Sequence, residues 1–391
     1  MSTSTRNKFL AAAFMMATSA VGPGFLTQTA FFTEKLLASF GFVILVTVVL
    51  DIIAQLNIWR VIVVSEKRAQ DIANELLPGM GFLLAGLVVL GGFAFNIGNI
   101  AGAGLGMNIL FGMDVSHGAF WSALMAIGIF IVREAARVMD GVMKVLGILM
   151  ILLTVFVAWQ SNPPLAQAAK ETVMPLRFDF TAILTLVGGS VGGYITFAGA
   201  HRLLDTGIKG RDQVKNASTA AVTGIVLASI MRTVLFLAVL GVVSVGIALD
   251  SDNPAASVFR IVSGEVGYKL FGLVLWSAAI TSVIGAAYTS VSFVKSFHPV
   301  LQHYERYLII AFIVISTSVF LIVGKPVQVL VLAGALNGLI LPIALLLMLL
   351  AVHRQRIVGK EYKHPWRLSI AGFVVVLLMG YISVVSLIAY F

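Results

Sequence analysis

The sequence predicts an all-α polytopic membrane protein with about 11 transmembrane helices. Hydrophobic residues make up 59% of its 391 positions and charged residues only 11%, whereas a soluble domain carries roughly a quarter charged residues. Apolar runs of about 20 residues, long enough to cross a bilayer, recur along the whole chain between short charged patches. The chain has no cysteine, which excludes disulfides, thiolate metal sites and cysteine nucleophiles.

The apolar runs set the order of the spans. The first run, residues 9–32, is too long for a cleaved signal peptide and is expected to remain as a span. The longest loop, residues 160–179, leaves no room for a soluble catalytic domain, so the function is expected within the membrane as a transporter or channel rather than an intramembrane enzyme. The expected helix centres are residues 21, 52, 95, 126, 150, 192, 234, 280, 315, 340 and 378.

The positive charges predict an orientation. Of the 26 Lys and Arg residues, 18 fall in the N-terminal tail and every second loop, and only 6 fall in the opposite loops. The positive-inside rule therefore predicts a plasma-membrane protein with a cytoplasmic N-terminus and, for an odd number of spans, an outside C-terminus. The net charge of +9 is read as this topology signal and as contacts with anionic lipid, not as a nucleic-acid site.

Two spans are interrupted near their middle. Gly22-Pro23-Gly24 breaks the first, because proline lacks a backbone donor and clashes with the preceding turn. Residues 188–194 of the sixth carry four glycines, which favour either a second break or close helix packing. Two broken spans five helices apart indicate an inverted repeat with a substrate site at the midplane. We expect one domain, residues 1–391, with repeats at about 8–160 and 177–352 and an additional helix at about 367–390.

The order of these motifs resembles the NRAMP family of secondary transporters over nearly the whole chain. Gly22-Pro23-Gly24-Phe25 stands in the register of the family's Asp-Pro-Gly-Asn break. The resemblance implies a LeuT-like core of five plus five helices, broken helices 1 and 6, one added helix and alternating access. The other segments that carry it are Asp51–Pro78 for the second span and its loop, Gly98–Gly112 for the third, Ser277–Ser292 for the eighth and Leu339–Pro342 for the tenth.

The sequence departs from the family where the family binds metal. The family's Asp and Asn at the first break and its Met at the second are replaced by Gly22, Phe25 and Tyr194. An acidic pair of the third span becomes Asn96 and Asn99, and a His after the Met register becomes Thr196, whereas a further His is matched by His201. A divalent ion needs several oxygen, nitrogen or sulfur ligands, so we predict no metal site, with Mn²⁺, Fe²⁺ or Mg²⁺ transport as the alternative.

A charged residue inside the seventh span points to a different substrate. Arg232 is costly in a bilayer unless it faces a cavity or a partner, and its guanidinium suits a carboxylate. Half-helix N-termini at both breaks are expected to offer free N–H groups to the same anion. The sequence thus predicts a small organic acid or amino-acid-like anion, although an ion pair of Arg232 with Asp51, or a lipid headgroup, remains open. The predicted binding residues are Gly22, Pro23, Gly24, Phe25, Gly192, Gly193, Tyr194, Thr196 and Arg232.

Five further residues are candidates for ion coupling or the transport path, with H⁺ or Na⁺ as the coupling ion. Asp51 is the only acid deep in a span, although pairing with Arg60 or Arg232 is the slightly favoured interpretation. His201 could gate a proton, but a solvated helix end is favoured. No cofactor is predicted, since no Gly-Lys-Ser/Thr ending follows the glycines, and no oligomeric state follows from the sequence. The five candidates are Asp51, Asn96, Asn99, His201 and Thr281, the last of which could equally join helices.

Overall fold

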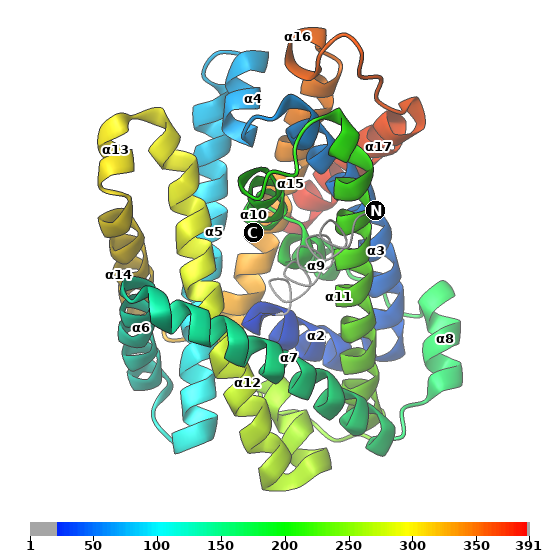
Figure 1. Ribbon diagram of the computed structural model, residues 1–391. Helices are drawn as coiled ribbons and strands as arrows, with labels where there is room; N and C mark the ends of the chain where they lie inside the picture. Colours follow the sequence, from blue (N-terminus) through cyan, green and yellow to red (C-terminus); the bar gives the residue numbers. More distant parts are fainter. Residues whose placement is uncertain (1–21, 389–391) are drawn as a thin grey trace.

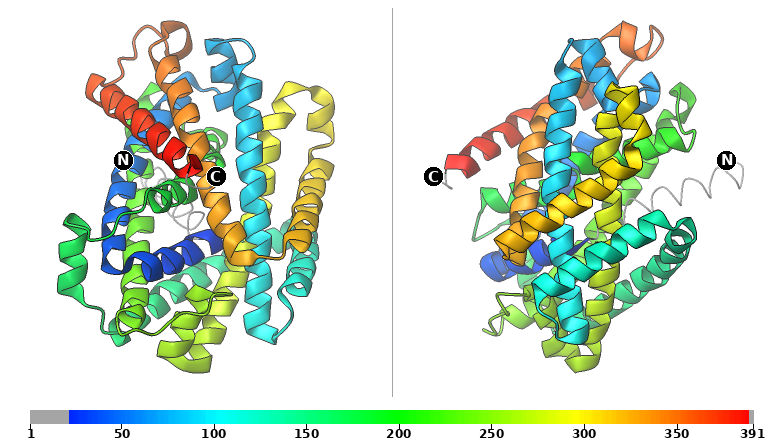
Figure 2. Two further views of the ribbon diagram at one scale, coloured as in Figure 1. Left: turned by 180° about the vertical axis from the view of Figure 1, so that it is seen from behind. Right: turned by 90° about the vertical axis from the view of Figure 1, so that its left-hand side faces the viewer.

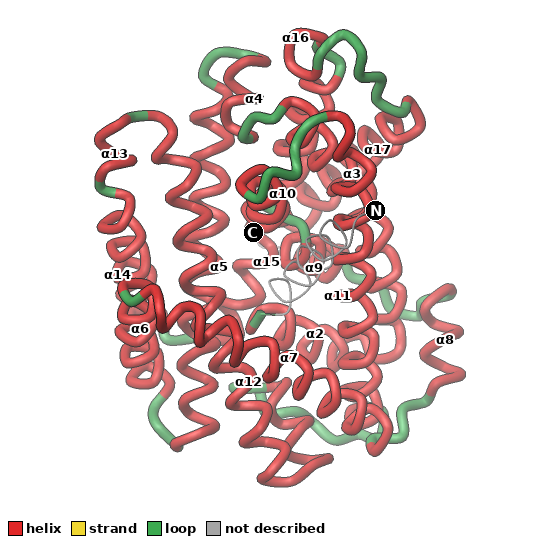
Figure 3. Tube along the Cα trace, viewed as in Figure 1, coloured by secondary structure: helices red, strands yellow, loops and turns green. Residues whose placement is uncertain are grey.

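Helices form most of residues 22–388, the part of the chain that the computed structural model describes, apart from the side chains of residues 133–140 and 142–144. No strand occurs in this part (Figure 3). The first half of the predicted first span, with its centre at residue 21, lies outside the described residues. The α-helices are α2 (Pro23–Leu36), α3 (Phe40–Ser65), α4 (Ala69–Leu76), α5 (Met80–Phe111), α6 (Val115–Ile131), α7 (Arg133–Gln160), α8 (Leu165–Val173), α9 (Phe180–Ser190), α10 (Tyr194–Asp205), α11 (Val214–Val243), α12 (Pro254–Val294), α13 (Pro299–His303), α14 (Glu305–Val323), α15 (Pro326–Val352), α16 (Gln355–Val358) and α17 (Trp366–Ile388).

The predicted spans correspond to these helices. By length and hydropathy, eight helical stretches of the described residues could cross a membrane, or nine if the bent pair formed by residues 145–160 and α8 is one span. That number is below 11 because Pro23–Ser65 counts once although it turns at Leu37, and because α6 has only 17 residues. Every other predicted centre lies in a helix, except that 192 falls in the break between α9 and α10.

The packing explains why these helices are rich in small residues. Figure 2 shows α5 and α15 running side by side, and α12 packs along α5 as well. Gly98 and Gly106 of α5 lie where an added Cβ would approach Leu330 of α15 to 3.1 Å and Trp276 of α12 to 2.6 Å. Small side chains let membrane helices approach closely where no hydrophobic effect drives them together.

The loops gather at two opposite ends of the bundle (Figure 1). At one end, Arg68 pairs with Asp205 at 2.9 Å and Arg211 pairs with Glu361, which joins the loops around α4, α10 and α16. At the other end, Lys35 pairs with Asp179 at 2.6 Å. Each of these ion pairs joins loops that are four spans apart, so loops separated by an even number of spans share an end, as alternate crossing requires.

A half-buried histidine holds the segment that precedes α17 against α3. His364 Nε2 lies 3.0 Å from Asn57 Oδ1 of α3, and its Nδ1 lies 3.1 Å from the Tyr362 hydroxyl. Burial, together with the nearby charges of Arg60 and His353, lowers the pKa of His364 from 6.5 to about 4. The folded protein therefore holds this ring neutral at a pH where the unfolded chain would protonate it.

This contact predicts an acid-sensitive stability. Between pH values of about 6.5 and about 4 the unfolded chain binds more protons at this site, so the free energy of unfolding is expected to fall as the pH falls through that window. Thermal unfolding of the detergent-purified protein across a pH series measures it. His364→Gln should reduce the loss of stability between about pH 6.5 and about 4, whereas a substitution of the exposed His117 by Gln should not. If His364→Gln loses as much stability at acid pH as the wild type does, other groups cause the pH dependence.

Candidate functional site

A helix begins at the first predicted break, and the half of the span before it lies outside the described residues. Gly22 is extended, with φ −101° and ψ −176°, and α2 begins at Pro23, whose fixed φ suits the first helical position. Gly102 of α5 faces the proline so closely that a Cβ on it would lie 2.2 Å from Pro23 Cβ. Gly22 itself faces Ser282 of α12 and Asn99 of α5. The break is therefore enclosed by α5 and α12.

The second break lies at residues 191–193, between α9 and α10. Gly193 has φ +49°, a left-handed conformation that glycine adopts without strain. The other two glycines of the cluster, Gly188 and Gly189, serve in packing, against Gly334 of α15 and Gln28 of α2. Both interpretations of the cluster are thus correct for different members: two glycines pack and two form the break.

Asn337 of α15 holds the second break in place. Its Nδ2 donates to Gly91 O of α5 and to Ala333 O, both at 2.9 Å, and its Oδ1 accepts from Tyr194 N at 3.3 Å. The next amide of α10, Ile195 N, donates to Gly192 O at 3.1 Å. The first two amides of α10 are therefore not free to bind an anion, contrary to the expectation for these two donors.

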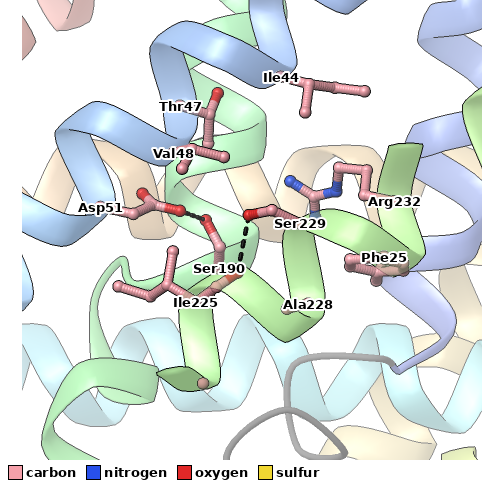
Figure 4. A pocket seen from close by; sticks show the side chains of 11 residues that line it. Phe25, Ile44, Thr47, Val48, Asp51, Ser190, Ile225, Ala228, Ser229 and Arg232 are labelled. Atoms are coloured by element: carbon pink, nitrogen blue, oxygen red, sulfur yellow. Dashed lines mark hydrogen bonds between the residues drawn. The ribbon is translucent and has the colours of Figure 1, made fainter. Parts of the chain in front are cut away.

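A pocket lies between α3 and α11, beside the start of α2 and the end of α9 (Figure 4). Its cavity volume is about 20 Å³, room for about one water molecule, within about 410 Å³ of space between atoms that is partly open to the surroundings. Two of its lining residues, Asp51 and Arg232, are ionisable. The lining consists of Phe25, Ile44, Thr47, Val48, Asp51, Ser190, Gly224, Ile225, Ala228, Ser229 and Arg232.

Arg232 is the principal hydrogen-bond donor of this pocket. Its side chain is 3% exposed, and its Cζ lies 4.3 Å from the centre of the Phe25 ring. Its Nε and Nη2 have no hydrogen-bond partner in the described part of the chain. A guanidinium stacked on an aromatic face keeps its N–H groups in its own plane, free to bind a further acceptor.

Asp51 does not form the predicted ion pair. Its Oδ2 accepts from Ser190 Oγ at 2.5 Å, and its Oδ1 has no partner among residues 22–388. No carboxylate of the described chain lies within 4 Å of Arg232, and Arg60 donates to Ser218 Oγ at 2.9 Å. The slightly favoured expectation of a direct Asp51 partner in Arg60 or Arg232 is therefore wrong, although Asp51 and Arg232 line the same pocket.

The remaining predicted residues do not line this pocket. Gly192 and Gly193 form the break, and Tyr194 packs against Phe95 with ring centres 5.4 Å apart. The others make contacts between or within helices. Thr196 O accepts from Trp59 Nε1 at 2.9 Å, Asn96 Nδ2 donates to Ser316 Oγ at 2.7 Å, Asn99 lies opposite Gly22, and Thr281 Oγ1 donates to Ala278 O at 3.0 Å.

His201 is not at a solvated helix end, contrary to the favoured expectation. Its side chain is 3% exposed and stacks on Phe293, with ring centres 4.8 Å apart. Its Nε2 accepts a hydrogen bond of 3.1 Å from the backbone N of Ala69, which is the first residue of α4. Tertiary packing covers this end of α10, which a single sequence does not reveal.

Three polar residues of the pocket were missed by the sequence reasoning. Thr47 precedes Asp51 by four positions and Ser229 precedes Arg232 by three, spacings that place each on the same helix face as its charged neighbour. Ser190 stands alone among glycines in an apolar span. The two spacings could have identified Thr47 and Ser229, and its isolation in an apolar span could have identified Ser190.

A bundle of membrane-length helices with two broken spans, and a buried pocket of opposite charges beside them, defines the class of membrane transporters with broken helices. The family model described as "Natural resistance-associated macrophage protein-like" matches residues 13–389. The chain therefore belongs to the NRAMP family. It is a secondary transporter and not an enzyme, as the sequence predicted.

Curated relatives and solved structures agree with this assignment. The chain is 57% identical over 378 residues to the uncharacterized membrane protein YcsG of Bacillus subtilis, covering 97% of this chain and 93% of that protein. It is 56% identical over 388 residues to an uncharacterized membrane protein of Haemophilus influenzae, covering 99% and 98%. A manganese transporter of Eremococcus coleocola superposes with a TM-score of 0.73 at 16% identity, covering 99% of this chain and 88% of that one. MhsT in complex with L-phenylalanine gives 0.66 at 16% identity, covering 98% of both chains, so the fold is LeuT-like.

Proposed function

We propose that this transporter carries a small organic acid or amino-acid-like anion by alternating access, coupled to H⁺ or Na⁺. The observation that carries the proposal is Arg232, buried in a membrane pocket with two guanidinium nitrogens unpartnered in the described part of the chain. An unpaired charge at membrane depth costs several kcal/mol, so such residues normally face a binding site. A carboxylate is the planar acceptor that fits two parallel N–H donors.

The start of α2 supports the same ligand. Pro23 has no N–H, and no side chain caps this end, so the helix leaves the amides of Gly24 and Phe25 without an intrahelical acceptor. The positive end of the helix dipole lies there, and the Phe25 ring lies directly against Arg232. A carboxylate in the pocket would meet positive charge from both elements.

Divalent metal transport, as in typical family members, is the second candidate. It is favoured by the family and by the manganese transporters among the fold neighbours. Against it, Gly22, Phe25 and Tyr194 supply no carboxylate, amide or thioether ligand for Mn²⁺, Fe²⁺ or Mg²⁺ at the breaks. Within residues 22–388, no three His, Asp or Glu side chains come together as a metal site.

A ligand screen distinguishes the two candidates. The detergent-purified protein is heated with Mn²⁺, lactate, pyruvate, succinate, glutamate or proline, since a ligand that binds only the folded state raises the apparent melting temperature. Uptake of the same compounds into proteoliposomes follows. We expect a shift and uptake for at least one carboxylate and none for Mn²⁺. Uptake of Mn²⁺ with no carboxylate bound would overturn the proposal.

The positive-inside rule gives the proposed orientation of the protein, with the N-terminus in the cytoplasm and the C-terminus outside. The two inverted repeats are proposed at about 8–160 and 177–352. Because the chain has no cysteine, single cysteines report it directly. In intact cells, a membrane-impermeant maleimide is expected to label Lys325→Cys, and Lys360→Cys only after permeabilisation. Both positions are exposed, at opposite ends of α15. The reverse labelling pattern would invert the orientation.

A further inference from the structure

We propose that Asp51 binds one proton for each monovalent anion that Arg232 binds, which makes this chain an electroneutral proton–anion symporter. The inference rests on the proposed function, because it requires an anion at Arg232. It adds the coupling ion, the group that carries it and the stoichiometry.

The geometry separates two opposite charges across one cavity. Asp51 comes from α3 and Arg232 from α11, and Figure 4 shows their side chains at opposite ends of the pocket. The Asp51 side chain is 2% exposed, and its Oδ1 is unpartnered among the described residues. The two groups interact electrostatically but are not in contact.

Arg232 is the charged group that faces Asp51. The other elements of the pocket contribute neutral side chains only: Phe25 from α2, Ser190 from α9, and Ser229 and aliphatic residues from α11. Arg60 lies further along α3 and bonds to Ser218. The protonation of Asp51 therefore responds chiefly to whether Arg232 is neutralised.

Charge balance gives the stoichiometry. We infer that the empty pocket holds one guanidinium and one ionised carboxylate, which sum to zero. A monovalent anion on Arg232 adds a second negative charge, and a like charge nearby favours protonation of a carboxylate. One proton on Asp51 restores the sum to zero. A carrier must reorient both loaded and empty, so an unchanged pocket charge avoids the penalty of burying net charge in either half of the cycle.

The donor set favours a proton over Na⁺. A metal cation requires several oxygen ligands, whereas a proton requires one. The hydroxyls of Thr47 and Ser229 donate back to the carbonyls of Val43 and Ile225, both at 2.7 Å, as side chains within a helix. Asp51 Oδ1 is the open carboxylate oxygen, and it suffices to accept a proton.

Ser190 connects this proton to the second break. Its hydroxyl bonds to Asp51 Oδ2, and it is the last residue of α9 before the break at residues 191–193. A hydrogen bond to a carboxylate is stronger than one to the neutral acid, so protonation of Asp51 weakens the tie between α3 and the end of α9. Binding of the proton therefore loosens a contact directly beside the break at residues 191–193, where the backbone can bend.

Proteoliposomes loaded with the dye pyranine test the coupling. The probe is lactate, pyruvate or glutamate, whichever gives the largest thermal shift, and a potassium–valinomycin clamp sets the membrane potential. We expect uptake of the probe to acidify the lumen. The rate of uptake should increase with the pH gradient and should not depend on the membrane potential. Asp51→Asn should retain exchange of labelled for unlabelled probe but lose accumulation driven by the pH gradient. The exposed Asp212→Asn should behave as the wild type.

The outcomes separate the two proposals. Absence of binding by every panel carboxylate refutes the proposed function itself. Uptake driven by Na⁺ alone, uptake that moves charge, or acidification retained in Asp51→Asn refutes the proton on Asp51 and leaves the anion site standing. Should Asp51→Asn not fold, calorimetry of the wild type in two buffers of different ionisation enthalpy still decides, with a maximum of about one proton taken up per anion across a pH series. If anion binding takes up no protons at any pH, the inference is overturned.

Discussion

Gly188→Ala is expected to destabilise the protein by about 3 kcal/mol or more and to abolish transport. An alanine Cβ at this position would lie 1.8 Å from Gly334 O and 2.4 Å from Gly338 N. Both are backbone atoms of α15, so no side chain can rotate away, and α9 must move off α15. That displacement would also disturb Asn337, which lies between the two glycines of α15 and holds the start of α10.

The matched control for Gly188→Ala is Gly86→Ala in α5, where an added Cβ meets nothing within 4 Å. Alanine stabilises a helix relative to glycine by about 1 kcal/mol, so the control should be neutral or slightly stabilising. Melting temperature and the monodisperse fraction in size-exclusion chromatography measure both variants. Equal melting temperatures would contradict the backbone contact between α9 and α15.

Arg232→Met is expected to remove anion binding while leaving the protein as stable as before or more so. A charge-assisted hydrogen bond contributes up to about 3 kcal/mol, so its loss should weaken binding about 100-fold. Methionine retains the apolar length that packs on Phe25, and it removes a buried charge with no ion-pair partner in the described part of the chain. The thermal shift as a function of carboxylate concentration gives the affinity, and the ligand-free melting temperature gives the stability.

Two further variants make the Arg232 result specific. Arg232→Lys should bind the anion with intermediate affinity, because an ammonium keeps the charge but not the bidentate geometry. Arg260→Met removes an arginine whose side chain is 60% exposed and which pairs with Glu265, so it should bind as the wild type does. Wild-type affinity in Arg232→Met would remove the main support for an anionic substrate.

The fold was largely predictable because its signals are local. Each apolar run reflects the bilayer thickness, and the breaks at Pro23 and Gly193 follow from residues that interrupt a helix wherever they stand. Thr33-Glu34-Lys35 ends the first apolar run, but the sharp turn at Leu37 was not predictable, because it is a left-handed conformation in a non-glycine residue. Such a turn is imposed by the surrounding packing and not by local preference.

The site was only partly predictable, because its contacts join distant parts of the chain. The choice of Arg232 and Asp51 followed from the rarity of charge within spans. The hydrogen bond between Ser190 and Asp51 joins residues 139 positions apart, and the cap that Asn337 provides for Tyr194 joins residues 143 apart. No single-sequence pattern encodes these pairings, and both change how the breaks are interpreted.

The second half of the sixth span acts mechanically as a lever. α10 has 12 residues and is about 18 Å long, with its pivot at the break and its second half tied to α4 through His201 and Ala69. A swing of about 10° at the pivot would carry the far end about 3 Å. A hydrogen bond tolerates only about 0.5 Å of stretch, so even a slight bend at the buried pivot either breaks that tie or drags α4 with it. A small bend at the buried break would thus produce a displacement of a few ångströms at the end of α10.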